Sequence, residues 1–121
     1  MLSYQHAYHA GNPADLHKHA AFAALVAALT RKPRPVTVME SHAGRGLYDL
    51  EAPEAVKTGE AARGIMRVAP ADGPFAEALA AVRAAHGPSA YPGSPLIARH
   101  LLRETDRLVL CELHPGEHRA L

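Results

Sequence analysis

The sequence contains no tryptophan and one cysteine, and aromatic residues make up only 5% of it. A single cysteine excludes an intrachain disulfide, and the apolar run around Cys111 predicts a buried strand residue rather than a reactive thiol. No apolar run approaches the length of about 18 residues that a membrane span needs. The first residues have neither a charged start nor an apolar core, unlike a signal peptide, so we expect a cytoplasmic protein without membrane partners.

An excess of one charge is also missing. The formal net charge is +1, with 9 histidines counted as neutral. Nucleic-acid-binding proteins usually carry a basic surplus, so the composition alone does not indicate RNA. Arg31, Lys32 and Arg34 form a local basic segment. The length of 121 residues and the hydrophobic content of 48% suit one small domain.

Helical and strand-like segments alternate along the chain, which predicts an α/β fold. Asn12 is a good N-cap and Pro13 suits the first helical position, so a helix should begin there and end by Lys32, before Pro33. The other expected elements are a buried strand at 36–39, a helical stretch at 54–68 weakened by two glycines, a helix at 74–86, a loop at 90–93, a helix from 94 to about 103, a buried strand at 107–111 and a helix start at 115.

A glycine turn follows the first expected strand at residues 40–46 and contains Gly44 and Gly46. Ligands of doubly wound sheets bind at the carboxyl ends of strands, and glycines there let the backbone approach a nucleoside cofactor. The third glycine of the dinucleotide fingerprint is missing, which disfavours NAD. An ordinary turn with a surface histidine at His42 would explain the same residues, so this motif leaves both interpretations open.

Glu112 ends the second expected strand. A carboxylate in that position can accept hydrogen bonds from both ribose hydroxyls, usually about 20 residues after the glycine turn. Here residues 47–106 intervene, and we interpret them as a mostly helical insertion. Because exposed glutamates are common, a solvated strand end is the alternative explanation.

Histidines occur in close pairs, but no known set of metal ligands is completed, so we expect no metal site. His17 and His19 would face different sides of a helix. The segment from Tyr91 to Pro95 fits a turn and a helix cap. Tyr4 could either pack against the protein or stack on a base.

Longer blocks of sequence add a family-level signal. They lie at residues 1–4, 9–12, 14–15, 18–19, 42–44, 46, 48, 58–60, 64–65, 91–99, 101–104 and 112–115. The string Tyr-Pro-Gly-Ser-Pro-Leu-Ile-Ala-Arg at 91–99 is the most specific. On these blocks, which span essentially the whole chain, the sequence resembles the RlmJ-like family of bacterial 23S ribosomal RNA adenine-N6 methyltransferases.

The resemblance implies a Rossmann-like methyltransferase fold whose cofactor is S-adenosylmethionine, with a helical insertion after the first strand. Residues 1–121 would form the N-terminal part of that domain and residues 51–104 the insertion. Family contacts to the cofactor carry over to His19, His42, Ser94 and Glu112. Tyr4 matches a residue that contacts the substrate RNA, in an N-terminal segment that acts as a lid. The expected substrate is 23S RNA, protein-free or in early assembly, methylated by direct in-line transfer.

One departure concerns catalysis. The family's Asp-Pro-Pro-Tyr motif is absent from this sequence, so no catalytic residue is assigned in this chain. Only two of the seven strands that the resemblance implies are expected, which would leave sheet edges unpaired. We therefore expect either a piece of a longer enzyme or a truncated protein that self-associates. Two other hypotheses remain: a non-catalytic module that binds the cofactor or nucleic acid, and a homologue that acts on external DNA.

Overall fold

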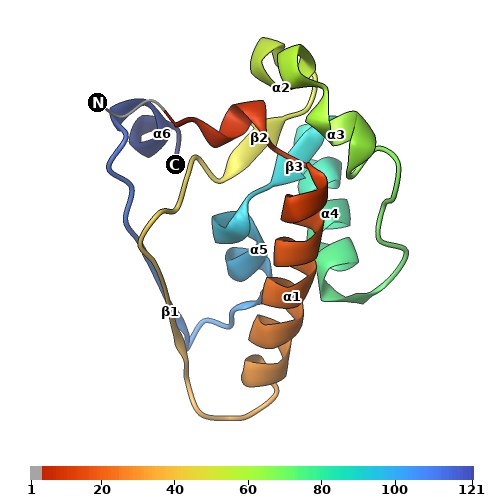
Figure 1. Ribbon diagram of the computed structural model, residues 1–121. Coiled ribbons are helices and arrows are strands. Elements are labelled where there is room, and N and C mark those ends of the chain that lie inside the picture. Colours follow the sequence, from red (N-terminus) through yellow and green to blue (C-terminus); the bar gives the residue numbers. More distant parts are fainter. Residues whose placement is uncertain (1–3) are drawn as a thin grey trace.

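The computed structural model describes residues 4–121 and shows a group of helices beside a pair of parallel strands (Figure 1). The first three residues of the N-terminal match lie outside the described residues. In chain order the elements are the 3-10 helix η1 (His6–Tyr8), α1 (Pro13–Thr30), β1 (Thr37–Glu40), β2 (Leu47–Asp49), α2 (Pro53–Thr58), α3 (Glu60–Arg63), α4 (Gly73–His86), β3 (Ala90–Pro92), α5 (Ser94–Leu101), β4 (Arg107–Leu110) and α6 (Pro115–Ala120). This order of helices and strands confirms the predicted α/β class.

Helix α1 begins as predicted. The side chain of Asn12 accepts a hydrogen bond from the backbone N–H of Asp15 at 2.8 Å, and Pro13 occupies the first turn. The buried residues of α1 recur at helical spacing on the face that packs against α4 and α5. They are Asp15, His19, Ala23 and Val26.

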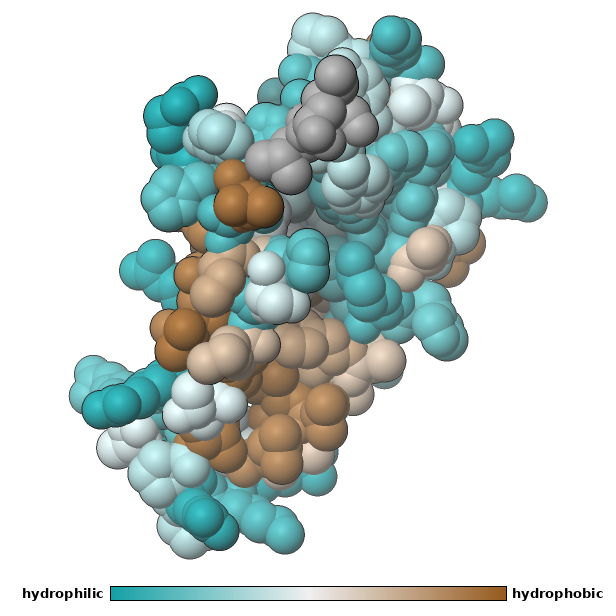
Figure 2. All heavy atoms as spheres, turned by 60° about the vertical axis from the view of Figure 1, so that its left-hand side comes forward, coloured by the Kyte–Doolittle hydropathy of each residue, from teal (hydrophilic) through white to brown (hydrophobic). Residues whose placement is uncertain are grey.

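Strands β1 and β4 form a parallel pair in which Glu40 lies beside Leu110, so their carboxyl ends meet at the same edge. The prediction that both strands are buried is wrong: half-buried and exposed residues alternate, and Met39 is 69% exposed. Cys111 is exposed as well, contrary to the prediction. The reason is that α1, α4 and α5 pack chiefly on one another, and only α5 packs closely on β4. Figure 2 shows apolar side chains gathered on the face where β1 comes forward.

The segment between the parallel strands contains a second, antiparallel pair, β2 and β3. Residues 90–92 were expected to be a loop, yet they form β3, because Tyr91 pairs with Tyr48 and both side chains are buried. The helical stretch at 54–68 is interrupted at Gly59, whose φ of 65° ends α2. Helix α5 begins after Gly93, and no side chain caps it.

The core lies where α1, α4, α5 and β3 meet. Its largest fully buried side chains include Tyr91, Ile65, Ile97 and His19. Two of these four carry polar groups, so the core also holds potential site residues. Within residues 4–121 no helix has the length and apolar character to cross a membrane.

Candidate cofactor-binding site

The loops that leave β1 and β4 are joined by hydrogen bonds just beyond the strand ends. The backbone N–H of Cys111 donates to the carbonyl of Glu40 at 2.8 Å, and that of Ala43 donates to the carbonyl of Cys111 at 2.9 Å. The parallel pairing therefore continues one step past β1. It fixes the glycine turn beside the segment that carries Glu112.

Glu112 lies at the centre of this junction. Its two carboxylate oxygens accept hydrogen bonds from the backbone N–H groups of His114 and Gly44, each at 2.7 Å. These hydrogen bonds, that of His114 first, lower the pKa of the Glu112 carboxyl below its usual value. Each oxygen retains a free lone pair, so an ionised Glu112 can still accept hydrogen bonds from a ligand.

Gly44 has to be a glycine for this arrangement. Its φ is +72°, and a Cβ atom there would lie 2.5 Å from the hydroxyl oxygen of Tyr48. The left-handed conformation aims its N–H at Glu112 while leaving the space above the turn open. Gly44 of the predicted glycine turn thus lies at a close contact between the loops that follow β1 and β4.

A cavity of about 610 Å³ opens over this junction. All five residues expected from the family resemblance line it: Tyr4, His19, His42, Ser94 and Glu112. They come from the N-terminal segment, α1, the two strand ends and α5. Small-molecule sites typically measure about 300–1,000 Å³, so the cavity has the size of a nucleoside cofactor site. The structure brings the five residues together, while their individual binding roles stay predictions.

His19 forms a buried wall of the cavity. Its Nδ1 lies 2.7 Å from the hydroxyl oxygen of Tyr91, and only 2% of the residue is exposed. Burial lowers the pKa of His19 to about 4, against an opposing effect of Asp15. The imidazole is therefore neutral at physiological pH.

His42 lies at the rim of the cavity and, unlike His19, is not buried. It is exposed, and its Nδ1 lies 2.9 Å from the hydroxyl oxygen of the neighbouring Ser41. His19 is thus held rigidly in the core, whereas His42 is open to solvent.

Ser94 and Glu40 connect α5 to the end of β1. The hydroxyl of Ser94 donates a hydrogen bond to Glu40 Oε2. The other oxygen, Glu40 Oε1, is buried and has no hydrogen-bond partner within residues 4–121. Burial raises the pKa of the Glu40 carboxyl above its usual value. Because buried acceptors are normally satisfied, this unpaired oxygen beside the cavity suits a ligand with a hydrogen-bond donor or a positive charge.

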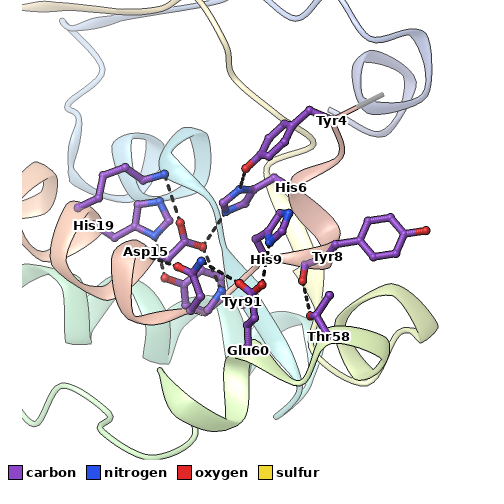
Figure 3. Close-up of polar contacts among 12 residues, drawn as sticks. Tyr4, His6, Tyr8, His9, Asp15, His19, Thr58, Glu60 and Tyr91 are labelled. Carbon is purple, nitrogen blue, oxygen red and sulfur yellow. Dashed lines mark hydrogen bonds and ion pairs between the residues drawn. The ribbon is translucent and has the colours of Figure 1, made fainter. Parts of the chain in front are cut away.

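A chain of three polar side chains anchors the N-terminal segment over the cavity (Figure 3). The hydroxyl oxygen of Tyr4 lies 2.7 Å from His6 Nδ1, and His6 Nε2 lies 2.7 Å from Asp15 Oδ2. Asp15 is buried, and the same oxygen accepts the backbone N–H of Gly11 at 3.0 Å. Burial alone would raise the pKa of Asp15, but the hydrogen bond and charge of His6 outweigh it and lower the value to about 2. Asp15 is therefore ionised and accepts a hydrogen bond from His6 Nε2–H.

Arg45, between the two glycines of the turn at 40–46, is paired in the structure. Its Nη2 and Nε lie 2.6 and 2.9 Å from the two carboxylate oxygens of the buried Glu117 on α6. The guanidinium also lies 6.0 Å from the centre of the Tyr48 ring. The pair joins the turn after β1 to α6, and the charge of Arg45 is compensated.

Several residues that line the cavity or adjoin it were not predicted from the sequence. They are His6, Lys18, Glu40, His114 and Glu117. Two signals were available: Lys18 precedes His19 in a matched block, and Glu40 is a carboxylate at a strand end, like Glu112. Glu117 carried no such signal, because its partner Arg45 lies 72 positions away in the sequence. His6 lies close in sequence to its partners Tyr4 and Asp15, but no local pattern set it apart. In the described part of the chain, no group of three or more His, Cys, Asp or Glu side chains is arranged to hold a metal ion.

A parallel strand pair whose carboxyl ends border a cofactor-sized cavity defines the N-terminal part of an α/β methyltransferase fold. Residues 33–121 match the family described as "Ribosomal RNA large subunit methyltransferase D, RlmJ", and the chain belongs to this family.

Two curated relatives and one solved structure show the extent of the similarity. The chain is 43% identical to Ribosomal RNA large subunit methyltransferase J of Escherichia coli and 38% identical to its namesake in Haemophilus influenzae, in both cases over 98% of this chain and 44% of the relative. A crystal structure of a Legionella pneumophila protein with the family model DUF519 superimposes with a TM-score of 0.77 at 37% identity, covering 93% of this chain and 43% of that one. The chain thus spans less than half the length of these relatives.

Proposed function

We propose that this chain is the cofactor-binding part of an S-adenosylmethionine-dependent methyltransferase that modifies the N6 of an adenine in 23S ribosomal RNA. The observation that supports this most strongly is the single cavity that joins the two strand ends at His42 and Glu112 to the buried His19 of α1. The relatives named as large-subunit ribosomal RNA methyltransferases support the substrate class. Within this proposal residues 51–104 form the insertion of a partial domain 1–121, and the protein works in the cytoplasm.

The donors and acceptors of the cavity fit S-adenosylmethionine. Glu112 would hold the ribose hydroxyls, because its carboxylate is ionised and fixed by two backbone N–H groups. Glu40, with its unpaired oxygen, and Ser94 would lie near the positively charged part of the ligand. His19 and His42 would bind its other polar groups. The cofactor supplies a methyl group on a sulfonium, which a nucleophilic nitrogen can accept.

The residues of this chain would bind and orient rather than transfer protons. The glycine turn lets the cofactor approach the backbone, and η1 with Tyr4 would close one side of the cavity and reduce access of water. Tyr4 is 66% exposed, so its ring can also contact a substrate base outside the helical stack. The groups that hold the adenine amine would come from outside this chain.

Two measurements on the purified protein test the proposal. Isothermal titration with S-adenosylmethionine should show one site, and the His42→Ala variant should bind more weakly. His100→Ala, an exposed histidine on α5 away from the cavity, is the matched control and should bind normally. Lack of binding to the wild-type protein would contradict the proposal.

A methyl-transfer assay then separates the remaining hypotheses. The substrates are unmodified, protein-free 23S RNA and free DNA, each with the 121-residue chain and with any longer product of the same gene. Transfer to RNA supports the proposal. Cofactor binding without transfer by either product would favour a non-catalytic module, and transfer to DNA alone would favour a DNA substrate.

A further inference from the structure

Tyr91 and His19 form a hydrogen-bonded polar pair inside the core, one helical turn from the buried Asp15. Tyr91 lies on β3 and His19 on α1, and the hydroxyl oxygen of Tyr91 is 2.7 Å from His19 Nδ1 (Figure 3). The exposed fractions are 0% for Tyr91 and 2% for His19. Within residues 4–121 the Tyr91 hydroxyl has no other hydrogen-bond partner.

Burial of the pair determines which atom carries each proton. Burial lowers the pKa of His19 to about 4 and raises that of Tyr91, so both groups are neutral at pH 7. If His19 carried its proton on Nδ1, that N–H would donate to the Tyr91 oxygen, and the buried hydroxyl proton would have no acceptor. An unsatisfied buried donor costs about 1–3 kcal/mol. The tautomer with the proton on Nε2 avoids this cost, because Tyr91 then donates to Nδ1.

The other ring nitrogen is the one available to a ligand. His19 lines the cavity, and its Nε2 makes no hydrogen bond within the described part of the chain. With its proton on Nε2, His19 presents a donor rather than an acceptor. Lys18 also lines the cavity, and its ammonium group lies 3.2 Å from Asp15 Oδ1. A neutral N–H donor in a cavity that also holds an ammonium suits an acceptor oxygen of the ligand, above all one of a carboxylate.

We propose that Tyr91 is a positioning residue that fixes His19 in the Nε2–H tautomer and so makes it a hydrogen-bond donor to the carboxylate of the bound cofactor. This inference rests on the proposed cofactor site and assigns a role to a residue that does not itself line the cavity.

The contribution of the Tyr91 hydroxyl can be tested separately from that of its ring, because the ring packs against a neighbouring aromatic side chain. Phe75 of α4 packs edge-on against both rings, with centroid distances of 6.0 Å to His19 and 6.3 Å to Tyr91. Tyr91→Phe keeps these aromatic contacts and removes only the hydroxyl. Tyr8→Phe is the matched control, because the Tyr8 ring points away from this cluster (Figure 3) and does not line the cavity.

The first experiment measures the tautomer directly in the cofactor-free protein. Long-range ¹H–¹⁵N NMR spectra of the wild-type protein at pH 7 should show His19 protonated at Nε2. In Tyr91→Phe the Nδ1–H form should become populated, and in Tyr8→Phe the spectrum of His19 should not change. A wild-type His19 protonated at Nδ1 overturns the proposal, whether or not the variant folds.

The second experiment measures S-adenosylmethionine affinity by isothermal titration. Because one net hydrogen bond corresponds to about 0.5–1.5 kcal/mol, Tyr91→Phe should raise Kd about threefold to tenfold, and Tyr8→Phe should leave it unchanged. S-adenosyl compounds lacking the carboxylate should bind the wild-type protein and Tyr91→Phe equally. Equal Kd values for the intact cofactor would overturn the role of Tyr91. Absence of binding to the wild-type protein would instead refute the proposed function. In that case the NMR measurement of the His19 tautomer would still show whether Tyr91 positions His19.

Discussion

The carboxylate of Glu112 accepts a hydrogen bond from the backbone N–H of Gly44 at 2.7 Å. This contact joins the loop after β4 to the loop after β1, although the two residues lie 68 positions apart in the chain. One carboxylate thus organises the junction from which we infer cofactor binding. Substitutions at Glu112 should therefore weaken both the junction of the two loops and the binding of the ligand.

Glu112→Gln should weaken S-adenosylmethionine binding about 10-fold to 100-fold, since hydrogen bonds to a charged group contribute about 1.5–3 kcal/mol. The amide also presents N–H groups to one of the two backbone donors that the carboxylate now satisfies. Isothermal titration gives the affinity, and circular dichroism checks the fold. Glu104→Gln, in the exposed turn before β4, is the matched control. Equal affinities of the two variants would show that Glu112 does not hold the ligand.

Gly64→Ala should severely destabilise the protein. A Cβ atom at Gly64 would lie 2.0 Å from the carbonyl oxygen of Gly11 and 2.7 Å from the carbonyl carbon of Asn12, and backbone atoms cannot easily move aside. Steric overlap of this kind belongs to the mechanisms that cost about 4 kcal/mol or more. Urea denaturation followed by circular dichroism measures the loss.

Gly59→Ala is the control for this substitution. Gly59 has a φ of +65°, but no atom lies within 4 Å of the position that a Cβ atom would take. Only the left-handed conformation is therefore penalised, by about 1–2 kcal/mol. Similar losses in both variants would mean that the close approach of Gly64 to the start of α1 is not what limits the substitution.

The sequence predicted the fold wherever the signal was local. The capping of α1 by Asn12 and the strand at β1 follow from neighbouring residues, and the structure contains both. The pairing of β2 with β3 was missed, because a three-residue strand containing Tyr91 and Pro92 reads as a turn until Tyr48 is placed opposite it. Burial of Cys111 was mispredicted, since an apolar run does not reveal whether any helix covers the strand.

Some residues of the candidate site could likewise be predicted from the sequence, and others could not. His42 and Glu112 follow strands, so their convergence could be predicted from the rule that parallel strand ends meet at one edge. The inclusion of Ser94 and Tyr4 came only from the family resemblance. The link between Tyr91 and His19 depends on how β3 packs on α1, which no local pattern encodes.

Breaking the ion pair between Arg45 and Glu117 should leave a buried carboxylate without its partner. Glu117 is 4% exposed, whereas the side chain of Arg45 is 28% exposed and partly screened by solvent. We expect Arg45→Gln to cost about 2 kcal/mol of unfolding free energy, less than for a fully buried pair. In the Arg45→Gln/Glu117→Gln double variant part of this loss should be recovered, with a coupling energy of about 1–2 kcal/mol. Strictly additive losses in urea denaturation would exclude an energetic coupling.

Protonation of His19 should reduce stability in mildly acidic solution. Burial, the largest cause, lowers the pKa of His19 in the folded protein from 6.5 to about 4, so the unfolded chain binds more protons between these values. The stability contributed by the neutral imidazole is complete above pH 6.5 and is lost as the pH falls toward 4. The charged groups that act on the ring are Asp15, which raises the pKa, and Lys18 and His6, which lower it.

Urea denaturation at pH 7.0 and pH 4.5, on the wild-type protein and on His19→Asn, measures this contribution. Asn cannot titrate but can still accept the hydrogen bond of Tyr91. One pKa unit corresponds to about 1.4 kcal/mol, so the wild-type protein should lose about 2 kcal/mol more than the variant between the two pH values. Asp15, whose pKa is lowered to about 2, stays ionised in the folded protein over this interval. The other carboxylates are common to both proteins and largely cancel in the comparison. Equal losses would mean that His19 has an ordinary pKa and would remove the argument that it faces the cavity as a neutral donor.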